Sequence, residues 1–472
     1  MKRSKRIVVL LGVLACVCVV TLITMNYEQR KEDIKNTEAV ILEIPKETVT
    51  SLAWEYDTQS FAFSKDDSWK YDEDAAFPVN EDKINSLLEQ FESFGAAFVI
   101  ENVEDYGQYG LDDPTCTIRI GTEDNSYEVQ LGNYSTMDSQ RYVSIGDGNV
   151  YLVKDDPMDQ FEVSISDMIQ NDAAPSWSQV TSVAFSGNEN YDVTYTENST
   201  DTYCAEDVYF TEKDGSNKPL STSRMQTYLN TLRYLTLTDY ATYNATDEEL
   251  AEYGLDTPEL TVTVGYSYED EDGQLQKDSF VLNVGGSVSD EASGNTTDAS
   301  ADGTDSSDET TPDGYVRVGN SQIVYRVSGS TYKQLLAASY DDLRHEEVFS
   351  GSFDSITKLD VLLDDQLYTL TTEEKDGEQV WYYNDQEIDI ADVKSALTAL
   401  SADSFTSENT TEKQELALTL YLDNENYPEV SVQLYRYDGS DCLAVVDGET
   451  VSLVARSQVV DLIEALNKIV LN

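Results

Sequence analysis

A six-residue turn occurs twice in this chain, and it constrains the fold more than any other feature. Tyr109-Gly110-Leu111-Asp112-Asp113-Pro114 precedes a predicted strand over Thr115–Ile120. Tyr253-Gly254-Leu255-Asp256-Thr257-Pro258 precedes a predicted strand over Glu259–Val264 in the same way, 144 positions later. A segment that returns together with its context indicates a tandem array of related structural units.

The context of the turn does return. A predicted amphipathic helix lies before each copy, over Glu81–Phe94 and Thr222–Leu235, and Asn80 and Ser221 are placed to cap these helices. The inward residues predicted from the helical period are Leu87, Leu88 and Phe91 in the first helix and Met225, Leu229 and Leu232 in the second. After each strand come Leu131-Gly132 or Val284-Gly285, and then a predicted hairpin over Arg141–Val153 or Tyr315–Val327.

A third copy is predicted in the last 120 or so residues without the turn, since Asn409–Gln414 stands in its place. Its predicted helices are Ile390–Leu400 and Ser457–Ile469. The strands expected around them are Ile356–Leu363, Leu367–Thr372, Gln379–Tyr383, Leu416–Leu422, Val430–Tyr437, Leu443–Val446 and Val451–Val454. A degenerate last repeat is common because it has no successor to pack against.

The sequence therefore predicts an α+β fold: an N-terminal transmembrane helix followed by three related units, each an antiparallel sheet with a helix on one face. The expected divisions are a cytoplasmic tail and anchor over 1–27, a linker over 28–49, and units over 50–175, 176–350 and 351–472. An acidic insert at 286–314, rich in Ser, Thr, Asp and Gly, is expected to be disordered because it cannot repay the entropy of ordering.

The residues of the turn have a structural interpretation. Gly110 and Gly254 supply a positive φ, Leu111 and Leu255 anchor the turn in the core, and Asp112 and Asp256 bond nearby backbone N–H groups. Pro114 and Pro258 open strands where no ladder bond is needed. A ligand contact by Tyr109 or Tyr253 is the alternative.

The N-terminus carries a membrane signal. Lys2, Arg3, Lys5 and Arg6 precede an uncharged run from Ile7 to Met25. These 19 residues span about 28 Å as a helix, close to the bilayer core of about 30 Å. We expect an uncleaved anchor with a cytoplasmic N-terminus and the bulk of the chain outside. A cleaved signal peptide, or a lipoprotein signal ending at Cys16, are the alternatives.

The charge of the chain excludes whole classes of function. Thirty Lys and Arg stand against 90 Asp and Glu, a formal charge of −60, so a nucleic-acid partner is excluded. His345 is the single histidine, which excludes His-rich zinc sites and disfavours a Ser-His-Asp hydrolase; we interpret it as a polar residue near a domain boundary. Because the acids are spread over all three units, they indicate a solvated surface and not a localised site.

Few residues suggest chemistry. Asp298, Ser300, Asp302, Gly303 and Glu309 match the spacing of a calcium loop, but in so acidic a stretch a chance match is the simpler interpretation. Cys116, Cys204 and Cys442 are interpreted as buried thiols on strands. The tryptophans, interpreted as packing residues with sugar stacking as the alternative, are Trp54, Trp69, Trp177 and Trp381. We predict no catalytic residue, no cofactor and no metal.

The repeated turn, the Leu/Val-Gly step after the next strands and the Tyr142-Val143 and Tyr315-Val316 hairpins resemble the domain-of-unknown-function 4340 family. The resemblance covers roughly Thr50 to Ala338, and the last unit only by its strand order. It implies a bacterial envelope protein with one N-terminal membrane helix, in some members an accessory subunit of an ABC transport system. It implies no catalytic residues.

The expected function is a membrane-anchored, extracytoplasmic binding or scaffolding component of the bacterial envelope that is not an enzyme. Its expected partners are the membrane, through Ile7 to Met25, and an envelope or transporter protein. The alternatives are a carboxylate-based hydrolase of envelope polysaccharide, since two of the many acids would suffice for that chemistry, and a divalent-cation-dependent adhesin.

Overall fold

The computed structural model of the chain describes residues 39–288, 311–409 and 412–471. These residues form two compact units, one ending at Asn171 and one beginning at Asp172. The predicted membrane segment from Ile7 to Met25 and most of the acidic insert lie outside the described residues. Among the helices that are described, none combines the length and the apolar character needed to cross a bilayer.

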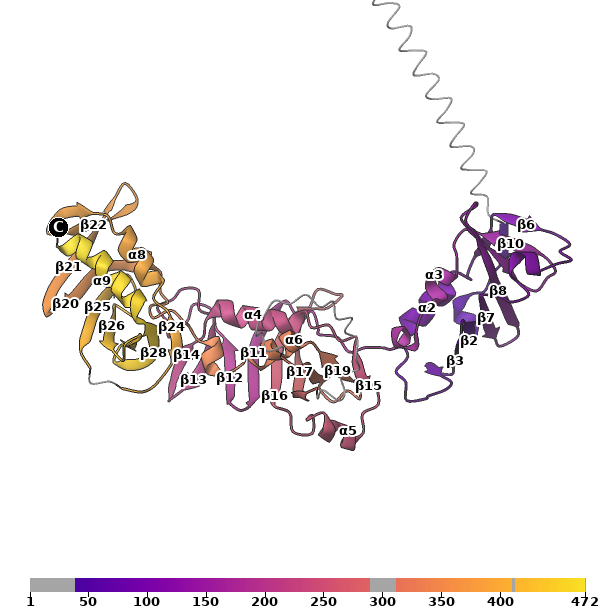
Figure 1. Cartoon of the computed structure of the whole chain (residues 1–472), viewed down its shortest axis with the longest axis horizontal. Coiled ribbons are helices and arrows are strands. Elements are labelled where there is room, and N and C mark those ends of the chain that lie inside the picture. Colours follow the sequence, from indigo (N-terminus) through magenta and orange to yellow (C-terminus); the bar gives the residue numbers. More distant parts are fainter. Residues whose placement is uncertain (1–38, 289–310, 410–411, 472) are drawn as a thin grey trace, which may run out of the picture. The chain divides into compact units, whose positions relative to one another are not determined.

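Three large antiparallel sheets dominate the structure, as the α+β prediction required (Figure 1). The first belongs to the N-terminal unit and has the order β4-β3-β2-β7-β8-β9-β10-β6. Its strands are β2 (Val49–Tyr56), β3 (Gln59–Lys65), β4 (Trp69–Tyr71), β6 (Phe98–Ile100), β7 (Cys116–Thr122), β8 (Ser126–Ser135), β9 (Gln140–Ser144) and β10 (Val150–Val153). A separate pair joins β1 (Ala39–Leu42) to β5 (Phe94–Ala96).

The second sheet opens the C-terminal unit and has the order β14-β13-β12-β11-β16-β17-β18-β19-β15. Its strands are β11 (Gln179–Gly187), β12 (Asn190–Tyr195), β13 (Tyr209–Lys213), β14 (Ser216–Pro219), β15 (Tyr240–Thr242), β16 (Leu260–Glu269), β17 (Leu275–Ser287), β18 (Gly314–Val318) and β19 (Val324–Val327).

The third sheet follows in the same unit with the order β23-β22-β21-β20-β25-β26-β27-β28-β24. Its strands are β20 (Ile356–Leu363), β21 (Gln366–Lys375), β22 (Glu378–Tyr383), β23 (Gln386–Ile388), β24 (Ala402–Phe405), β25 (Gln414–Leu422), β26 (Glu429–Arg436), β27 (Asp441–Val446) and β28 (Glu449–Ala455). All three sheets share one plan: a first meander, a helix, a short strand that joins the far edge, and a second meander.

Helices cover one face of each sheet. The N-terminal unit has α2 (Glu81–Glu89), α3 (Met158–Phe161) and three 3-10 turns, η1 (Lys46–Thr48), η2 (Gly107–Tyr109) and η3 (Ile165–Met168). The C-terminal unit has α4 (Thr222–Arg233), α5 (Asp247–Glu252), α6 (Gly329–Leu336), α7 (Tyr340–Leu343), η4 (Phe353–Ser355), α8 (Ala391–Thr398) and α9 (Arg456–Val470). Figure 1 shows α4 and α6 along the second sheet and α8 and α9 along the third.

The helical period predicted the buried faces correctly. Each inward residue expected from the sequence is at most 5% exposed, including Phe91 and Leu232 at 0%. Because the helices are amphipathic, this burial of their apolar stripes is what attaches them to the sheets. In the third sheet, Leu397 of α8 and Leu462 of α9 join one core with Leu418 of β25.

Several local predictions were wrong. The first helix ends at Glu89 and not at Phe94, because Phe94 belongs to β5 and pairs with Leu42. Asn80 caps α2 through the amide of Lys83, but the Ser221 side chain makes no cap on α4 and instead lies 3.0 Å from the Ser223 hydroxyl. Helix α5 was not predicted, although Thr246 and Glu249 form a capping box at its start.

Candidate functional site

The two repeated turns lie immediately before β7 in the first sheet and before β16 in the second. Gly110 has φ 72° and Gly254 has φ 68°, in the left-handed region that a turn of this kind requires. Leu111 and Leu255 are 5% and 4% exposed. Their amides close the turns by donating hydrogen bonds to the carbonyl oxygens of Tyr106 and Leu250, respectively. Pro114 and Pro258 precede β7 and β16. The predicted bonds of the aspartates are not found: among the described residues, no backbone N–H donates to the carboxylate of Asp112 or Asp256.

The tyrosines of the turns pack on the hairpins that follow. The ring of Tyr109 lies 5.0 Å from that of Tyr142, and the ring of Tyr253 lies 4.5 Å from that of Tyr315. Their carbonyl oxygens lie close to glycines within β8 and β17: a Cβ on Gly132 or Gly285 would lie 2.3 Å from the Tyr109 or Tyr253 oxygen. Each turn therefore needs a glycine at the strand position that faces its tyrosine carbonyl: Gly132 for Tyr109 and Gly285 for Tyr253.

The third sheet, which lacks the turn, also lacks the glycine at the corresponding strand position. Leu434 of β26 pairs with Leu416, as Leu131 pairs with Cys116 and Val284 with Leu260. The residue after Leu434 is Tyr435, where the first two sheets have glycine. Because the turn is missing from this unit, no carbonyl needs the space, and a side chain can occupy it.

The other candidate residues do not converge on a site. Cys116, Cys204 and Cys442 are free and buried; Cys116 and Cys442 lie on strands as predicted, but Cys204 lies in the loop before β13. Burial raises the pKa of these thiols, to about 12 for Cys116 and about 11 for the other two. The four tryptophans are buried, with Trp177 the most exposed at 8%, as the packing interpretation expected.

Within the described ranges, no group of three or more His, Cys, Asp or Glu side chains is arranged to hold a metal ion. Asp298, Ser300, Asp302, Gly303 and Glu309, the calcium-like spacing, lie outside the described residues.

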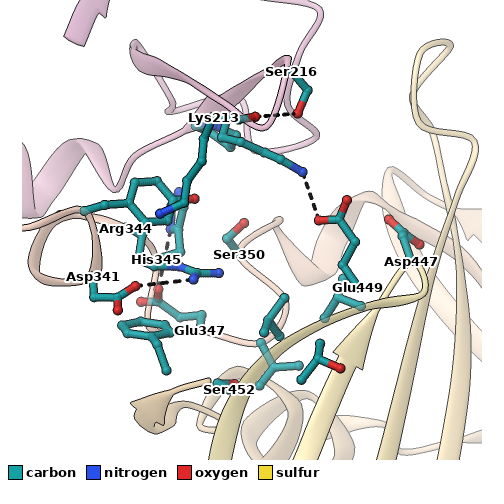
Figure 2. Close-up of a pocket in the computed structure, with 18 of the residues that line it drawn as sticks. Lys213, Ser216, Asp341, Arg344, His345, Glu347, Ser350, Asp447, Glu449 and Ser452 are labelled. Carbon is teal, nitrogen blue, oxygen red and sulfur yellow. Dashed lines mark hydrogen bonds and ion pairs between the residues drawn. The ribbon is translucent and has the colours of Figure 1, made fainter. Parts of the chain in front are cut away.

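A cleft of about 870 Å³ opens in the C-terminal unit between the second and third sheets (Figure 2). Two hairpins border it, β13–β14 of the second sheet and β27–β28 of the third. Each hairpin turns on an Asp-Gly pair with positive φ, Asp214-Gly215 and Asp447-Gly448. This is the composition that two-residue hairpin turns favour, because both central residues must take left-handed conformations.

The segment between α7 and η4, which joins the two sheets, forms the floor of the cleft. It is bonded to both sheets. Val348 donates its amide to Leu400 and Ala402 donates to Glu346, which attaches the segment to the third sheet. Arg224 of α4 pairs with Glu346 at 2.6 Å, which attaches it to the second. Tyr203, from the loop before β13, stacks on Phe349 with the ring planes 8° apart.

His345 is the main titratable group of this floor. Its Nε2 lies 2.9 Å from Oδ1 of Asp207, whose side chain is 1% exposed, and its Nδ1 lies 3.5 Å from Glu347. Burial disfavours the charged ring, but the hydrogen bonds to Asp207 and Glu347 outweigh it and raise the pKa of His345 to about 9. The same contact, against the opposing effect of burial, lowers the pKa of Glu347 to about 2.

The raised pKa favours the imidazolium form of His345 at neutral pH. A protonated ring can neither accept a proton as a general base nor ligate a metal, so in this form His345 is a positive charge fixed beside Asp207. Our sequence interpretation of His345 as a polar residue at a domain boundary located it correctly but missed its buried partner, because Asp207 is 138 positions away in sequence.

The fold and the cleft define a tandem α+β protein built on one repeated sheet plan, with a polar cleft between the last two sheets. The chain belongs to the DUF4340 family, a domain of unknown function, which matches residues 69–258 and 241–419. The first match runs from β4 to the strand-opening Pro258, and the second runs from β15 into β25, so each includes parts of two successive sheets. No curated protein and no solved structure matches the chain.

Proposed function

We propose that the protein is a membrane-anchored, extracytoplasmic component of the bacterial cell envelope that binds or scaffolds and is not an enzyme. The run from Ile7 to Met25 would anchor it, with the N-terminus in the cytoplasm. The acidic surface supports this location, because it keeps an exposed chain soluble and away from anionic headgroups. An ABC transport system is the proposed neighbour.

The observation that carries the binding role is the cleft. Its lining is charged and polar, and its volume of about 870 Å³ is typical of a ligand site. Two successive repeats contribute its walls: a hairpin from each, with the segment that joins them as the floor. The one histidine in it is held as an imidazolium by a buried carboxylate. Such a site offers fixed charges for the recognition of a ligand.

The hydrolase alternative finds less support. A glycosidase needs a carboxylic acid whose pKa is raised so that it can protonate the leaving group. Among the described residues, the carboxylates with a displaced pKa all have it lowered: Asp147, Asp167, Glu249, Asp270, Glu347, Asp360 and Asp438. Binding therefore remains the better proposal.

The location is tested with an introduced thiol. Met137, between β8 and β9, is 91% exposed, whereas the native cysteines of the described residues are buried. With Met137→Cys, we expect a membrane-impermeant maleimide to label intact cells from which any outer barrier has been removed. Ser4→Cys, in the tail, should label only after the membrane is opened. The reverse pattern would overturn the proposed orientation.

The absence of catalysis is tested on the full-length protein in detergent. We expect no new reducing ends when it is incubated with cell-wall glycan. Turnover that disappears in Glu347→Gln or Glu449→Gln, but not in Asp376→Asn outside the cleft, would replace the binding role with a hydrolase.

A further inference from the structure

The basic side chains of the cleft all come from one side. Lys213, Lys218, Arg344 and His345 belong to the second sheet or to the segment that follows it. Lys213 Nζ lies 3.8 Å from the ring centroid of Tyr340, and Arg344 Cζ lies 5.1 Å from the same centroid. Figure 2 shows both side chains directed toward the cavity.

The cation at Lys213 is available to a ligand. Arg344 lies 3.5 Å from Asp341, and Lys218 pairs with Glu449 at 2.9 Å. No carboxylate of the described residues lies within ion-pair distance of Lys213 Nζ, in a chain with three acids for each base. Lys213 is exposed, so its ammonium group, held beside the Tyr340 ring, is open to an anion that enters the cleft.

The opposite side of the cleft carries acids without bases, whereas the side with the bases also contributes Asp201, Asp214, Asp341, Glu346 and Glu347 to the lining. The third sheet and its loops contribute Glu408, Asp447 and Glu449 to the lining, and no basic residue. Glu408 accepts a hydrogen bond from the Tyr437 hydroxyl at 2.6 Å, and Asp447 accepts one from the Ser431 amide at 2.8 Å. Neither carboxylate has a cationic partner among the described residues, so this wall is suited to a positive group.

A free strand edge runs along the cleft between these charges. All four residues of β14 line it, and β14 pairs only with β13. Residues 213 and 216 flank the two-residue turn, and Leu220 donates its amide to Tyr209, so the bonded pairs alternate and leave the Asn217 N–H and C=O facing outward. Pro219 presents a carbonyl there but no N–H.

This edge offers few backbone groups for further pairing. Pro and Lys on an edge strand are devices that prevent pairing with long strands. Here they confine pairing to Asn217 and the Pro219 carbonyl, which two or three peptide groups would satisfy. A sugar or a simple anion would leave the edge groups unpaired, whereas a short peptide uses them as well as the charges.

We propose that the cleft binds a short zwitterionic peptide in extended conformation. Its carboxylate contacts Lys213 and Arg344, its ammonium group contacts Asp447 and the acids beside it, and its backbone pairs with Asn217. This inference rests on the proposed binding role and names its ligand class. The volume of about 870 Å³ accommodates several residues.

Calorimetry on the full-length protein in detergent tests the ligand. The probes are trialanine, N-acetyl-trialanine, trialanine amide, and trialanine methylated on its central nitrogen. We expect trialanine to bind, and each blocked terminus to weaken binding about tenfold, the loss of one charge-assisted contact. N-methylation should weaken it as well. Equal affinity for an end-blocked probe would overturn the zwitterion, and equal affinity for the N-methylated probe would overturn the peptide.

Matched variants locate the site. Lys213→Gln and Asp447→Asn should each weaken trialanine binding about tenfold, and Asn is well tolerated at the positive φ of residue 447. Lys65→Gln removes a lysine from the ring of Trp69, and Asp376→Asn changes another Asp-Gly turn. Neither residue lines the cleft, so neither variant should weaken trialanine binding. Binding that survives Lys213→Gln and Asp447→Asn would show that the peptide binds elsewhere.

The outcomes separate this inference from the proposed function. If no probe binds, the peptide class is wrong, while the thiol-labelling and glycan experiments still decide location and catalysis on their own. If the labelling shows that the bulk of the chain lies in the cytoplasm, the proposed function fails even if trialanine binds.

Discussion

The imidazole of His345 and the carboxylate of Asp207, 138 positions apart in sequence, meet at 2.9 Å beneath the cleft. Asp207 is 1% exposed and also accepts a hydrogen bond from Thr202 at 2.6 Å. A buried carboxylate requires a compensating charge, and the histidine provides it from the segment that joins two sheets. The pair therefore attaches that segment to the second sheet.

The first prediction concerns the charge of this histidine. Because His345 is the single histidine in the chain, its ring protons can be identified by NMR without further assignment. We expect them to titrate with a pKa of about 9, and Asp207→Asn to lower this pKa. Titration of the native protein near the ordinary value of 6.5 would contradict the ion pair.

The second prediction is the dependence of stability on pH. The folded pKa of His345, about 9, exceeds its ordinary value of 6.5, so its contribution is complete below 6.5 and is lost as pH rises through 9. The pKa of Glu347 is lowered from 4.5 to about 2, so its contribution is lost as pH falls from 4.5 toward 2. Chemical denaturation across pH, followed by tryptophan fluorescence, checks both.

His345→Gln is the control for this pH profile. It should reduce the fall in stability between pH 6.5 and 9 while leaving the acid limb largely unchanged. An identical alkaline fall in this variant would assign the effect to other groups.

The third prediction concerns the close approach of a turn to a strand. Gly285→Ala places a methyl group 2.3 Å from the Tyr253 carbonyl oxygen, so the backbone must shift. We expect a loss of about 2 kcal/mol or more in the free energy of unfolding. Gly439→Ala, where nothing lies within 4 Å, should change stability by less than about 0.5 kcal/mol. Similar values for both would remove the role given to the glycine.

The fourth prediction concerns the junction of the second and third sheets. Tyr203 stacks on Phe349 at 5.4 Å and meets Tyr427 edge-on at 5.7 Å. Tyr203→Ala should cost about 3 kcal/mol through the cavity it leaves, whereas Tyr203→Phe should cost less because the rings remain packed. Tyr234→Ala, at a residue 75% exposed, is the control and should be nearly neutral in denaturant unfolding.

The fifth prediction concerns the thiols. Burial raises the pKa of Cys116, Cys204 and Cys442 and shields them, so the native protein should react with a thiol reagent at these positions only after unfolding. Colourimetric thiol counting with and without denaturant measures this, with peptide mapping to separate the three sites from Cys16 and Cys18. Rapid modification of Cys204 in the native state would show that its loop opens.

Local pattern was sufficient for much of the fold. The helical period identified the buried faces of α2 and α4, because an amphipathic helix has only one way to bury its stripe on a sheet. The repeated Tyr-Gly-Leu-Asp turn and the alternating strands beside it indicated related antiparallel units, and three sheets with one strand order are present. The errors lie at ends, such as Phe94, where a neighbouring strand competes with the helix.

The cleft could not be predicted from the sequence. Nothing in the segments around Asp207, Lys213, His345 or Asp447 marks them as neighbours, since each lies in an ordinary loop, hairpin or linker of an acidic chain. The sequence by itself determined the repeats, the sheet class and the spread of negative charge, because these depend on periodicity and composition. Only the tertiary structure decided that the basic side chains and the acidic hairpin of successive units face one cleft, because that depends on how two sheets pack and not on the pattern of either.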